Sequence, residues 1–202
     1  MQNEPCSCFS TGITGPNHDA RGFEANGLAT CLRTFDHDQP HFLLELSNLY
    51  IPEGPGQIVP LAQSPAGQIK GWIADCDTNT LNALLELARI EAERTYHYYV
   101  ARGSHVMLMD GEILLAMTDF NSELPDTVQL GRDCTLSTLR GKGHAHHAVG
   151  LYLAQAAERG VKRATLFSAS DMAAHAHQVV GFEPIGDWTL FRFDGLQTSV
   201  AS

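Results

Sequence analysis

The stretch RGKGHA, residues 140–145, decides the fold of this chain. It lies between a β-like run, residues 127–135, and a helical run, residues 145–159. A glycine turn before a helix aims free backbone N–H groups and the positive end of the helix dipole at one point. The glycines remove the Cβ atoms that would hold an anion away, while Arg140 and Lys142 add positive charge. The sequence therefore predicts a phosphate-binding loop.

The spacing of the loop selects among the known phosphate-binding patterns. A Walker loop needs G-x-x-x-x-G-K-[ST], which the sequence lacks, and a Rossmann turn needs a third glycine where this chain has His146. The pattern R/Q-x-x-G-x-G/A does fit, with Arg140, Gly143 and Ala145 in its fixed places. In this respect the stretch resembles the pyrophosphate loop of the GNAT N-acetyltransferase superfamily.

The segments on either side of the loop resemble the same superfamily in order and spacing, from about residue 105 to 195. The helix after the loop carries an apolar stripe with a period of 3.6 residues. A short helix then ends in Val180-Gly-Phe-Glu183, which is similar to the L-G-F signature of the family. The predicted elements of this half are a fourth strand at 128–135, a fifth strand at 163–168, a short helix at 171–180 and a last strand at 188–193.

The preceding half supplies the remaining elements of that fold. Asp110-Gly111 is a hairpin turn signal between two apolar runs. The predicted elements are a strand at 57–62, helices at 64–76 and 81–100, and hairpin strands at 106–109 and 113–117. The resemblance implies an α/β (α+β) fold: a mixed, mostly antiparallel sheet with flanking helices and a splayed strand pair at the coenzyme A site.

Composition and turn signals divide the chain. Residues 1–20 are polar and rich in glycine and serine, so we expect disorder there. The turn at Pro52–Gly56 is the best boundary. We expect residues 21–55 to be an N-terminal extension, with a faint resemblance to the tail of a degenerate acetyltransferase-like repeat. Residues 56–195 would be the GNAT domain, followed by a tail at 196–202.

Composition also limits the classes of function. The formal net charge of −10 argues against nucleic acid and anionic membranes as partners. We see neither a signal peptide nor an apolar run of membrane-spanning length. The five cysteines, which fit no zinc spacing, predict reduced thiols in a cytoplasmic protein. A homodimer is left open.

The resemblance implies acetyl-CoA as the acyl donor. Its pantetheine arm would lie along the fourth strand, paired with backbone groups of Asp133, Cys134 and Thr135. Its pyrophosphate would lie on the loop. The predicted cofactor-binding residues are Cys134, Thr135, Arg140, Gly141, Lys142, Gly143, His144, Ala145 and Ser170. Ser170 stands where the family commonly has Asn.

Two catalytic candidates follow. His177 stands where many family members carry Tyr, four residues before the glycine of the signature. A histidine can protonate the departing thiolate, and its ordinary pKa of about 6.5 suits that task; the alternative is a helix-surface role. Asp133 is a candidate general base, directly or through water, or else a member of a structural ion pair. Asp126 and Glu123 are further base candidates in the preceding loop.

Asn121 is a candidate for substrate contact or for turn stabilisation. The histidines at 144, 146, 147, 175 and 177 invite a metal site, but their spacing fits none and we predict no metal. The predicted function is transfer of an acetyl group from acetyl-CoA to a primary amine of a small molecule or peptide. A coenzyme A-binding sensor or pseudoenzyme is the alternative, and a metal-binding regulatory protein is a third.

Overall fold

The computed structural model describes residues 32–81, 84–168 and 171–193. Contacts divide the chain into two compact units, and the larger comprises Leu43–Leu166 with His175–Glu183. All side chains discussed below as a candidate site belong to this larger unit.

Some predictions fall outside the described residues. They are the disorder expected for residues 1–20, the C-terminal tail at 196–202 and the cofactor contact of Ser170. The domain boundary at 52–56 stays a prediction.

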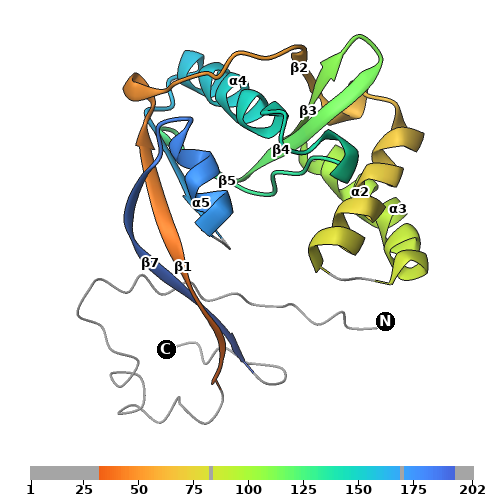
Figure 1. Ribbon diagram of the computed structural model, residues 1–202, viewed down its shortest axis with the longest axis horizontal. Coiled ribbons are helices and arrows are strands. Elements are labelled where there is room, and N and C mark those ends of the chain that lie inside the picture. The colour runs from red at the N-terminus through yellow and green to blue at the C-terminus, as the bar shows by residue number, and fades with distance from the viewer. Residues whose placement is uncertain (1–31, 82–83, 169–170, 194–202) are drawn as a thin grey trace. The chain divides into compact units, whose positions relative to one another are not determined.

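Seven strands of the described part form one mixed sheet in the order β2-β3-β4-β5-β6-β1-β7 (Figure 1). The pairs β2–β3, β3–β4 and β4–β5 are antiparallel, whereas β5–β6 is parallel. The strands are β1 (Leu32–Glu45), β2 (Gln57–Pro60), β3 (His105–Asp110), β4 (Ile113–Glu123), β5 (Thr127–Leu130), β6 (Arg163–Phe167) and β7 (Glu183–Phe193).

Four α-helices of the described part accompany the sheet: α2 (Ala66–Leu81), α3 (Leu85–Arg102), α4 (His144–Glu158) and α5 (Asp171–Gln178). Helix α3 ends at Gly103, whose φ of +71° gives the left-handed backbone that terminates a helix. None of the described helices is long and apolar enough to cross a membrane.

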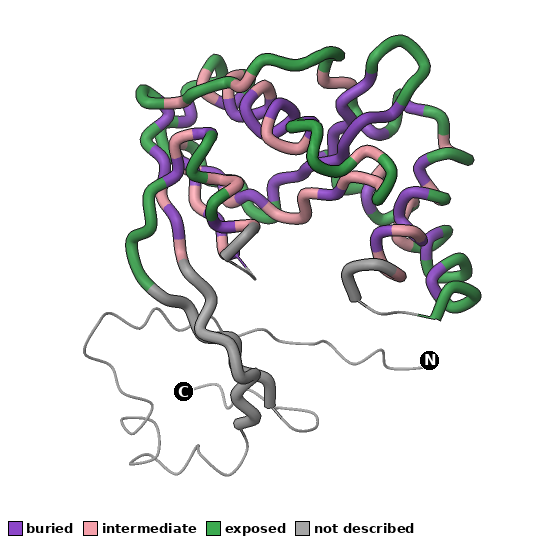
Figure 2. Tube along the Cα trace, in the orientation of Figure 1, coloured by how far each residue is buried: buried purple, intermediate pink, exposed green. Residues whose placement is uncertain are grey.

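Strand β3 lies between two helical layers. Successive side chains of a strand point to opposite faces. Met107 and Met109 therefore pack in one apolar cluster with residues of α2 and α3, while Leu108 packs with Ala148 of α4 in another. Helices α2 and α3 thus cover one face of the β3–β4 hairpin and α4 covers the other. Figure 2 shows the resulting run of buried residues along β3, β4 and α4.

The predicted fold class and element order are confirmed, with three differences. The strand predicted at 128–135 ends at Leu130, because the regular ladder with β4 stops there: Asp119 binds the N–H of Gly131 with its backbone carbonyl and the N–H of Arg132 with its carboxylate. The last strand begins at Glu183 instead of residue 188. Strand β1 was not predicted, since its residues show no clean alternation of apolar and polar side chains.

Candidate functional site

The predicted phosphate loop adopts the backbone that an anion cradle requires. Gly141 and Gly143 have φ angles of +75° and +79°, which favour glycine. Gly143 caps α4 without a side-chain hydrogen bond, so the first N–H groups of the helix stay uncapped by side chains. A Cβ at either glycine would meet nothing within 4 Å. The loop therefore faces open space with helix N–H groups directed at it, as an oxyanion ligand needs.

The parallel strands β5 and β6 pair over a short distance and then part. Their register joins Thr127 to Arg163, Val128 to Ala164 and Gln129 to Thr165. Strand β5 ends one residue later, at Leu130, whereas β6 continues to Phe167. The ladder between the two strands thus ends at Gln129, and the pair is splayed beyond it, as predicted.

The segment after β5 rejoins β4 through Cys134. The N–H of Cys134 donates to the carbonyl oxygen of Met117 at 2.9 Å, and its own carbonyl accepts from the Met117 N–H at 2.8 Å. Backbone groups of alternate residues in an extended chain point to opposite sides. Such an alternation would turn the backbone groups of Asp133 and Thr135 away from β4, and the carbonyl of Thr135 does accept a hydrogen bond from the side chain of Arg140 instead of from β4.

Two details link the end of this segment to the loop. The Nε–H of Arg140 donates to the carbonyl oxygen of Thr135 at 3.1 Å. This hydrogen bond holds the guanidinium group of Arg140 next to the segment that follows β5. The hydroxyl of Thr135 is buried and has no hydrogen-bond partner among the described residues. An unpartnered buried hydroxyl beside an open cradle fits a polar ligand there.

A half-buried acid–imidazole pair includes one residue of this segment. Oδ2 of Asp133 is 3.7 Å from Nε2 of His177 on α5, and the two side chains are 16% and 13% exposed. The other carboxylate oxygen, Oδ1, accepts a hydrogen bond of 2.5 Å from the hydroxyl of Thr118 on β4. The imidazole also meets the ring of Phe182 edge to face, with centroids 6.0 Å apart.

Burial sets the protonation of this pair. It raises the pKa of Asp133 to about 6, although the Thr118 hydrogen bond and the nearby charge of His146 act in the opposite direction. It lowers the pKa of His177 to about 4. At pH 7 Asp133 is therefore mainly a carboxylate and His177 a neutral imidazole. The expectation that His177 keeps an ordinary histidine pKa is wrong, because α5 and Phe182 shield the ring from water.

Two histidines of α4, His144 and His147, contribute to the packing of that helix. Nδ1 of His147 bonds the carbonyl of Pro52 at 2.7 Å, and a Cβ at Gly54 would approach the His147 ring to 2.9 Å. His144 is also buried. Within the described ranges, no cluster of three or more His, Cys, Asp or Glu side chains is arranged to hold a metal ion.

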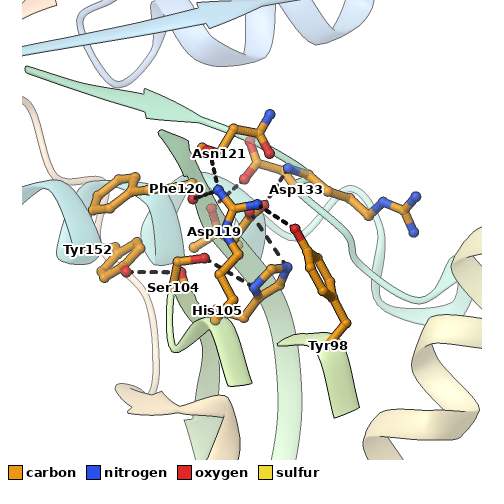
Figure 3. A network of polar contacts seen from close by, with 11 residues as sticks. Tyr98, Ser104, His105, Asp119, Phe120, Asn121, Asp133 and Tyr152 are labelled. Carbon is orange, nitrogen blue, oxygen red and sulfur yellow. Dashed lines mark hydrogen bonds and ion pairs between the residues drawn. The ribbon is translucent and has the colours of Figure 1, made fainter. Parts of the chain in front are cut away.

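A second polar network, which includes Asp119 of β4 and His105 of β3, lies close to Asp133 (Figure 3). Asp119, 2% exposed, accepts the backbone N–H of Arg132 at 2.7 Å and lies 3.6 Å from His105. Burial raises the pKa of Asp119 to about 6 and lowers the pKa of His105 to about 3. Tyr99 stacks on the His105 ring at 3.6 Å. This network holds the chain just before Asp133.

Asn121 belongs to the border of that network. The backbone carbonyl oxygen of Asn121 accepts a hydrogen bond from the guanidinium group of Arg102. Its side-chain oxygen would lie 2.5 Å from a Cβ atom placed at Gly131. A register shift between Phe120 and Ser122 places Asn121 in a bulge of β4. These contacts account for a structural role of Asn121, and its contact with substrate stays a prediction.

Helix α2 is tied to the same segment by two links. Cys76 and Cys134 form a disulfide, and Asp77 makes an ion pair of 2.5 Å with Arg132. The prediction that all cysteines are reduced is therefore wrong for this pair, whose partners lie 58 residues apart in sequence and meet through the tertiary fold. Disulfides are uncommon in reducing compartments; a cytoplasmic location stays a prediction.

Solved structures share this architecture. A GCN5-related N-acetyltransferase from Kribbella flavida matches 86% of the chain with 18% identity and a TM-score of 0.56. An acetyltransferase of the GNAT family from Colwellia psychrerythraea matches 86% with 16% identity and a TM-score of 0.57. A tandem GNAT protein from the clavulanic acid biosynthesis pathway matches 95% with 17% identity and a TM-score of 0.53. The chain has the GNAT fold.

At such identities the likeness establishes the fold alone. The match covers 63%, 62% and 64% of the three neighbours, so this chain spans less than two thirds of their length. No protein-family model matches the sequence, and no curated protein matches it.

Within the GNAT fold, the tertiary structure brings most predicted residues together. Asp133 and His177 meet, and Thr135 joins the loop through Arg140. The loop residues Gly141, Lys142, Gly143, His144 and Ala145 follow at the start of α4.

Cys134 requires a correction within the GNAT fold. Its N–H and carbonyl are paired with Met117 and its sulfur with Cys76, so its backbone is not free to pair with a pantetheine arm as predicted. On its C-terminal side, the carbonyl of Thr135 accepts a hydrogen bond from Arg140, and pairing of Asp133 and Thr135 with a pantetheine arm stays a prediction.

The alternative base candidates lie in surface ion pairs. Asp126 pairs with Arg163 at 2.8 Å, and Glu123 lies 3.6 Å from Arg159. The hydrogen bond from Thr127, and then that from Arg163, hold the pKa of Asp126 below its usual range. Thr118 is the site residue that sequence reasoning missed, because a threonine in a β-strand carries no signal of its own.

Proposed function

We propose that the protein transfers an acetyl group from acetyl-CoA to a primary amine of a small molecule or peptide. The observation that carries this proposal is the half-buried Asp133–His177 pair next to the point where strands β5 and β6 part. The GNAT fold and the anion cradle at the start of α4 support it. The cytoplasm remains the proposed location.

The chain offers a binding surface for each part of the donor. The cradle of Gly141 and Gly143, with the helix N-terminus, suits a pyrophosphate. The backbone groups of Asp133 and the N–H of Thr135 would suit the amide groups of a pantetheine arm, whereas the Thr135 carbonyl already accepts a hydrogen bond from Arg140. Acetyl-CoA would supply an activated thioester, which makes the carbonyl carbon susceptible to attack by an amine.

Asp133 and His177 divide the proton transfers. In the reaction a bond forms between the amine nitrogen and the acetyl carbon, and the carbon–sulfur bond breaks. The acceptor ammonium loses two protons: the carboxylate of Asp133 takes the first and passes it to solvent, and the second, lost from the nitrogen after attack, ends on the leaving sulfur, so that the products are the amide, the thiol and one proton. The neutral imidazole of His177 holds an N–H for that thiolate. Its pKa of about 4 makes an imidazolium acid rare at pH 7.

The acidity of the site favours a cationic acceptor. Among the described residues, no lysine or arginine forms an ion pair with Asp133, and the chain carries a net charge of −10. A protonated amine would thus find a carboxylate without a competing cation.

The alternative function is coenzyme A binding without turnover. The 3.7 Å between Asp133 and His177 exceeds a hydrogen bond, and His177 is mainly neutral. This geometry favours a weak catalyst over an efficient one.

One experiment separates the two functions. The purified protein is incubated with acetyl-CoA and a panel of primary amines, and acetylated products are detected by mass spectrometry. Product that disappears in Asp133→Asn supports acetyl transfer. Saturable coenzyme A binding without any acetylated amine supports the alternative, and absence of binding contradicts both.

A further inference from the structure

The two carboxylate oxygens of Asp133 have different partners. Oδ1 accepts the Thr118 hydroxyl at 2.5 Å, whereas Oδ2 faces Nε2 of His177 at 3.7 Å. The first distance is a short hydrogen bond and the second is too long for one. The carboxylate is therefore held at one oxygen and left accessible to reaction at the other.

The register of β4 places Thr118 opposite Asp133. Met117 and Cys134 form an isolated antiparallel bridge. Thr118, which follows Met117 on β4, and Asp133, which precedes Cys134, are therefore cross-strand neighbours. Directly opposed side chains on one face lie within contact distance. Threonine is branched at Cβ, which restricts its χ1 rotation and keeps the hydroxyl in place.

Burying the hydroxyl of Thr118 costs free energy, and its hydrogen bond to Asp133 offsets that cost. Thr118 is 1% exposed and sits in a strand whose neighbours, Met117 and Ala116, are fully buried. A buried hydroxyl is unfavourable unless it is hydrogen bonded. Valine would fill the same volume without that requirement, so packing alone does not explain a threonine here.

The groups that face Asp133 come from three elements. His177 approaches from α5, Thr118 from β4, and the charge of His146, at the start of α4, also acts on the carboxylate. The nearest arginine in sequence, Arg132, is engaged with Asp77. Asp119 adds a second buried carboxyl on the neighbouring β4 position, and its charge and that of Asp133 repel.

We infer that Thr118 is a positioning residue of the proposed acyl transfer, one that holds Oδ1 of Asp133 so that Oδ2 faces His177 and the acceptor amine. This inference rests on the proposed function, in which Asp133 takes the acceptor's proton. Thr118 itself touches no reacting atom. It also favours the ionised form of Asp133, because a hydroxyl donates to a carboxylate more strongly than to a neutral acid.

The test compares three variants. Thr118→Val removes the hydroxyl at nearly constant volume, and Thr118→Ser restores it. Thr127→Val is the matched control, since its hydroxyl donates to Asp126 at 3.0 Å on the other end of β5. The measurements are the pH profile of kcat/KM with an accepted amine and the NMR titration of the Asp133 carboxyl carbon, assigned with Asp133→Asn.

In Thr118→Val we expect the acidic limb of the profile and the Asp133 titration to move upward by about one pH unit. At pH 6 kcat/KM should fall about fivefold, because the ionised fraction of Asp133 falls from about one half to about one eleventh, and the loss should be smaller at pH 8.5. Thr118→Ser should restore the native profile, and Thr127→Val should leave it unchanged. Coinciding profiles and titrations for Thr118→Val and the native protein would overturn the inference.

Two provisions keep the test decisive. Should Thr118→Val not fold, Thr118→Ala removes the same hydroxyl without adding a methyl group to the strand, and the same outcomes apply. Should no amine be acetylated, the proposed function fails, but the NMR titration still decides whether Thr118 controls the ionisation of Asp133. Activity with an unmoved titration overturns the role of Thr118 alone.

Discussion

Asp133 and His177 approach each other from segments far apart in sequence, with Oδ2 of the carboxylate 3.7 Å from Nε2 of the imidazole. Burial moves their pKa values in opposite directions, to about 6 and about 4. Above about pH 6 His177 is a neutral imidazole and Asp133 is mainly a carboxylate. Asp133 is then suited to accept a proton and His177 to present an N–H.

The first prediction concerns the pH dependence of acetyl transfer. Because Asp133 must be ionised to accept a proton, kcat/KM should rise as the pH increases through about 6. Because His177 is already neutral above about pH 4, its titration should cause no loss of activity above pH 7. Steady-state kinetics from pH 5 to 9 test this, with a thiol-independent assay of the acetylated product. An activity that declines between pH 6 and 7.5 would show that imidazolium is the acid.

The second prediction separates the roles of the pair. His177→Ala and Asp133→Asn should each lower kcat by roughly 10²-fold or more, because each removes a proton-transfer group. Coenzyme A affinity, measured by calorimetry, should change little, since neither side chain belongs to the anion cradle. The tyrosine variant His177→Tyr should keep activity. Normal turnover in His177→Ala would assign the residue to helix packing.

The third prediction concerns the cradle. Millimolar coenzyme A should raise the melting temperature of the native protein, and the linkage is about 2.7 kcal/mol at a hundredfold excess over the dissociation constant. Gly143→Val should abolish that shift, because its side chain would enter the open space before α4.

A matched control exists at the opposite end of the same helix. Gly160 also has a positive φ, +97°, and a Cβ there meets nothing within 4 Å. Gly160→Val carries the same backbone penalty and should keep the coenzyme A shift. Equal loss of the shift in both variants would refute the placement of the cradle.

The fourth prediction concerns the Cys76–Cys134 disulfide. Reduction, or the double change to serine, should lower the free energy of unfolding by about 2 to 4 kcal/mol, because the crosslink restricts the unfolded chain. Urea unfolding with and without reductant measures this, and peptide mapping under alkylation verifies the pairing. The double variant should be insensitive to reductant; an equal response to reductant in both proteins would contradict the pairing.

The fifth prediction concerns Asp119. Its folded pKa of about 6 lies above the ordinary value of 3.8, so the folded state binds the proton more tightly than the unfolded state. Ionisation of Asp119 therefore destabilises the fold, and its cost develops as the pH rises from 4 through 6. Asp119→Asn keeps the acceptor for the Arg132 N–H and removes this cost.

Relative to the native protein, Asp119→Asn should gain roughly 1 to 3 kcal/mol of stability between pH 4.5 and pH 8. Urea unfolding at both pH values measures the gain. His105 is neutral throughout this range in the folded state, since burial lowers its pKa to about 3. A difference between the two proteins that does not vary with pH would show that Asp119 keeps its proton or that the site stays hydrated.

The sequence by itself determined the loop and the fold. The spacing of Arg140, Gly143 and Ala145 before a helical stripe depends on local backbone geometry, which is encoded within a few residues. Local periodicities predicted most of the strands and helices, and the resemblance of their order to the GNAT superfamily implied the fold. The sequence also identified Asp133 and His177 as candidate catalytic residues, because of their positions relative to the motifs of the GNAT superfamily.

Only the tertiary structure decided how these residues act. Register between β4 and the segment after β5 put Thr118 opposite Asp133 and committed the backbone of Cys134 to Met117. Burial, which arises when distant elements pack, shifted the pKa of His177 away from its ordinary value. The disulfide of Cys76 joined residues with no local relationship. Contacts across long sequence separations depend on packing and register, and a single sequence carries no local signal for either.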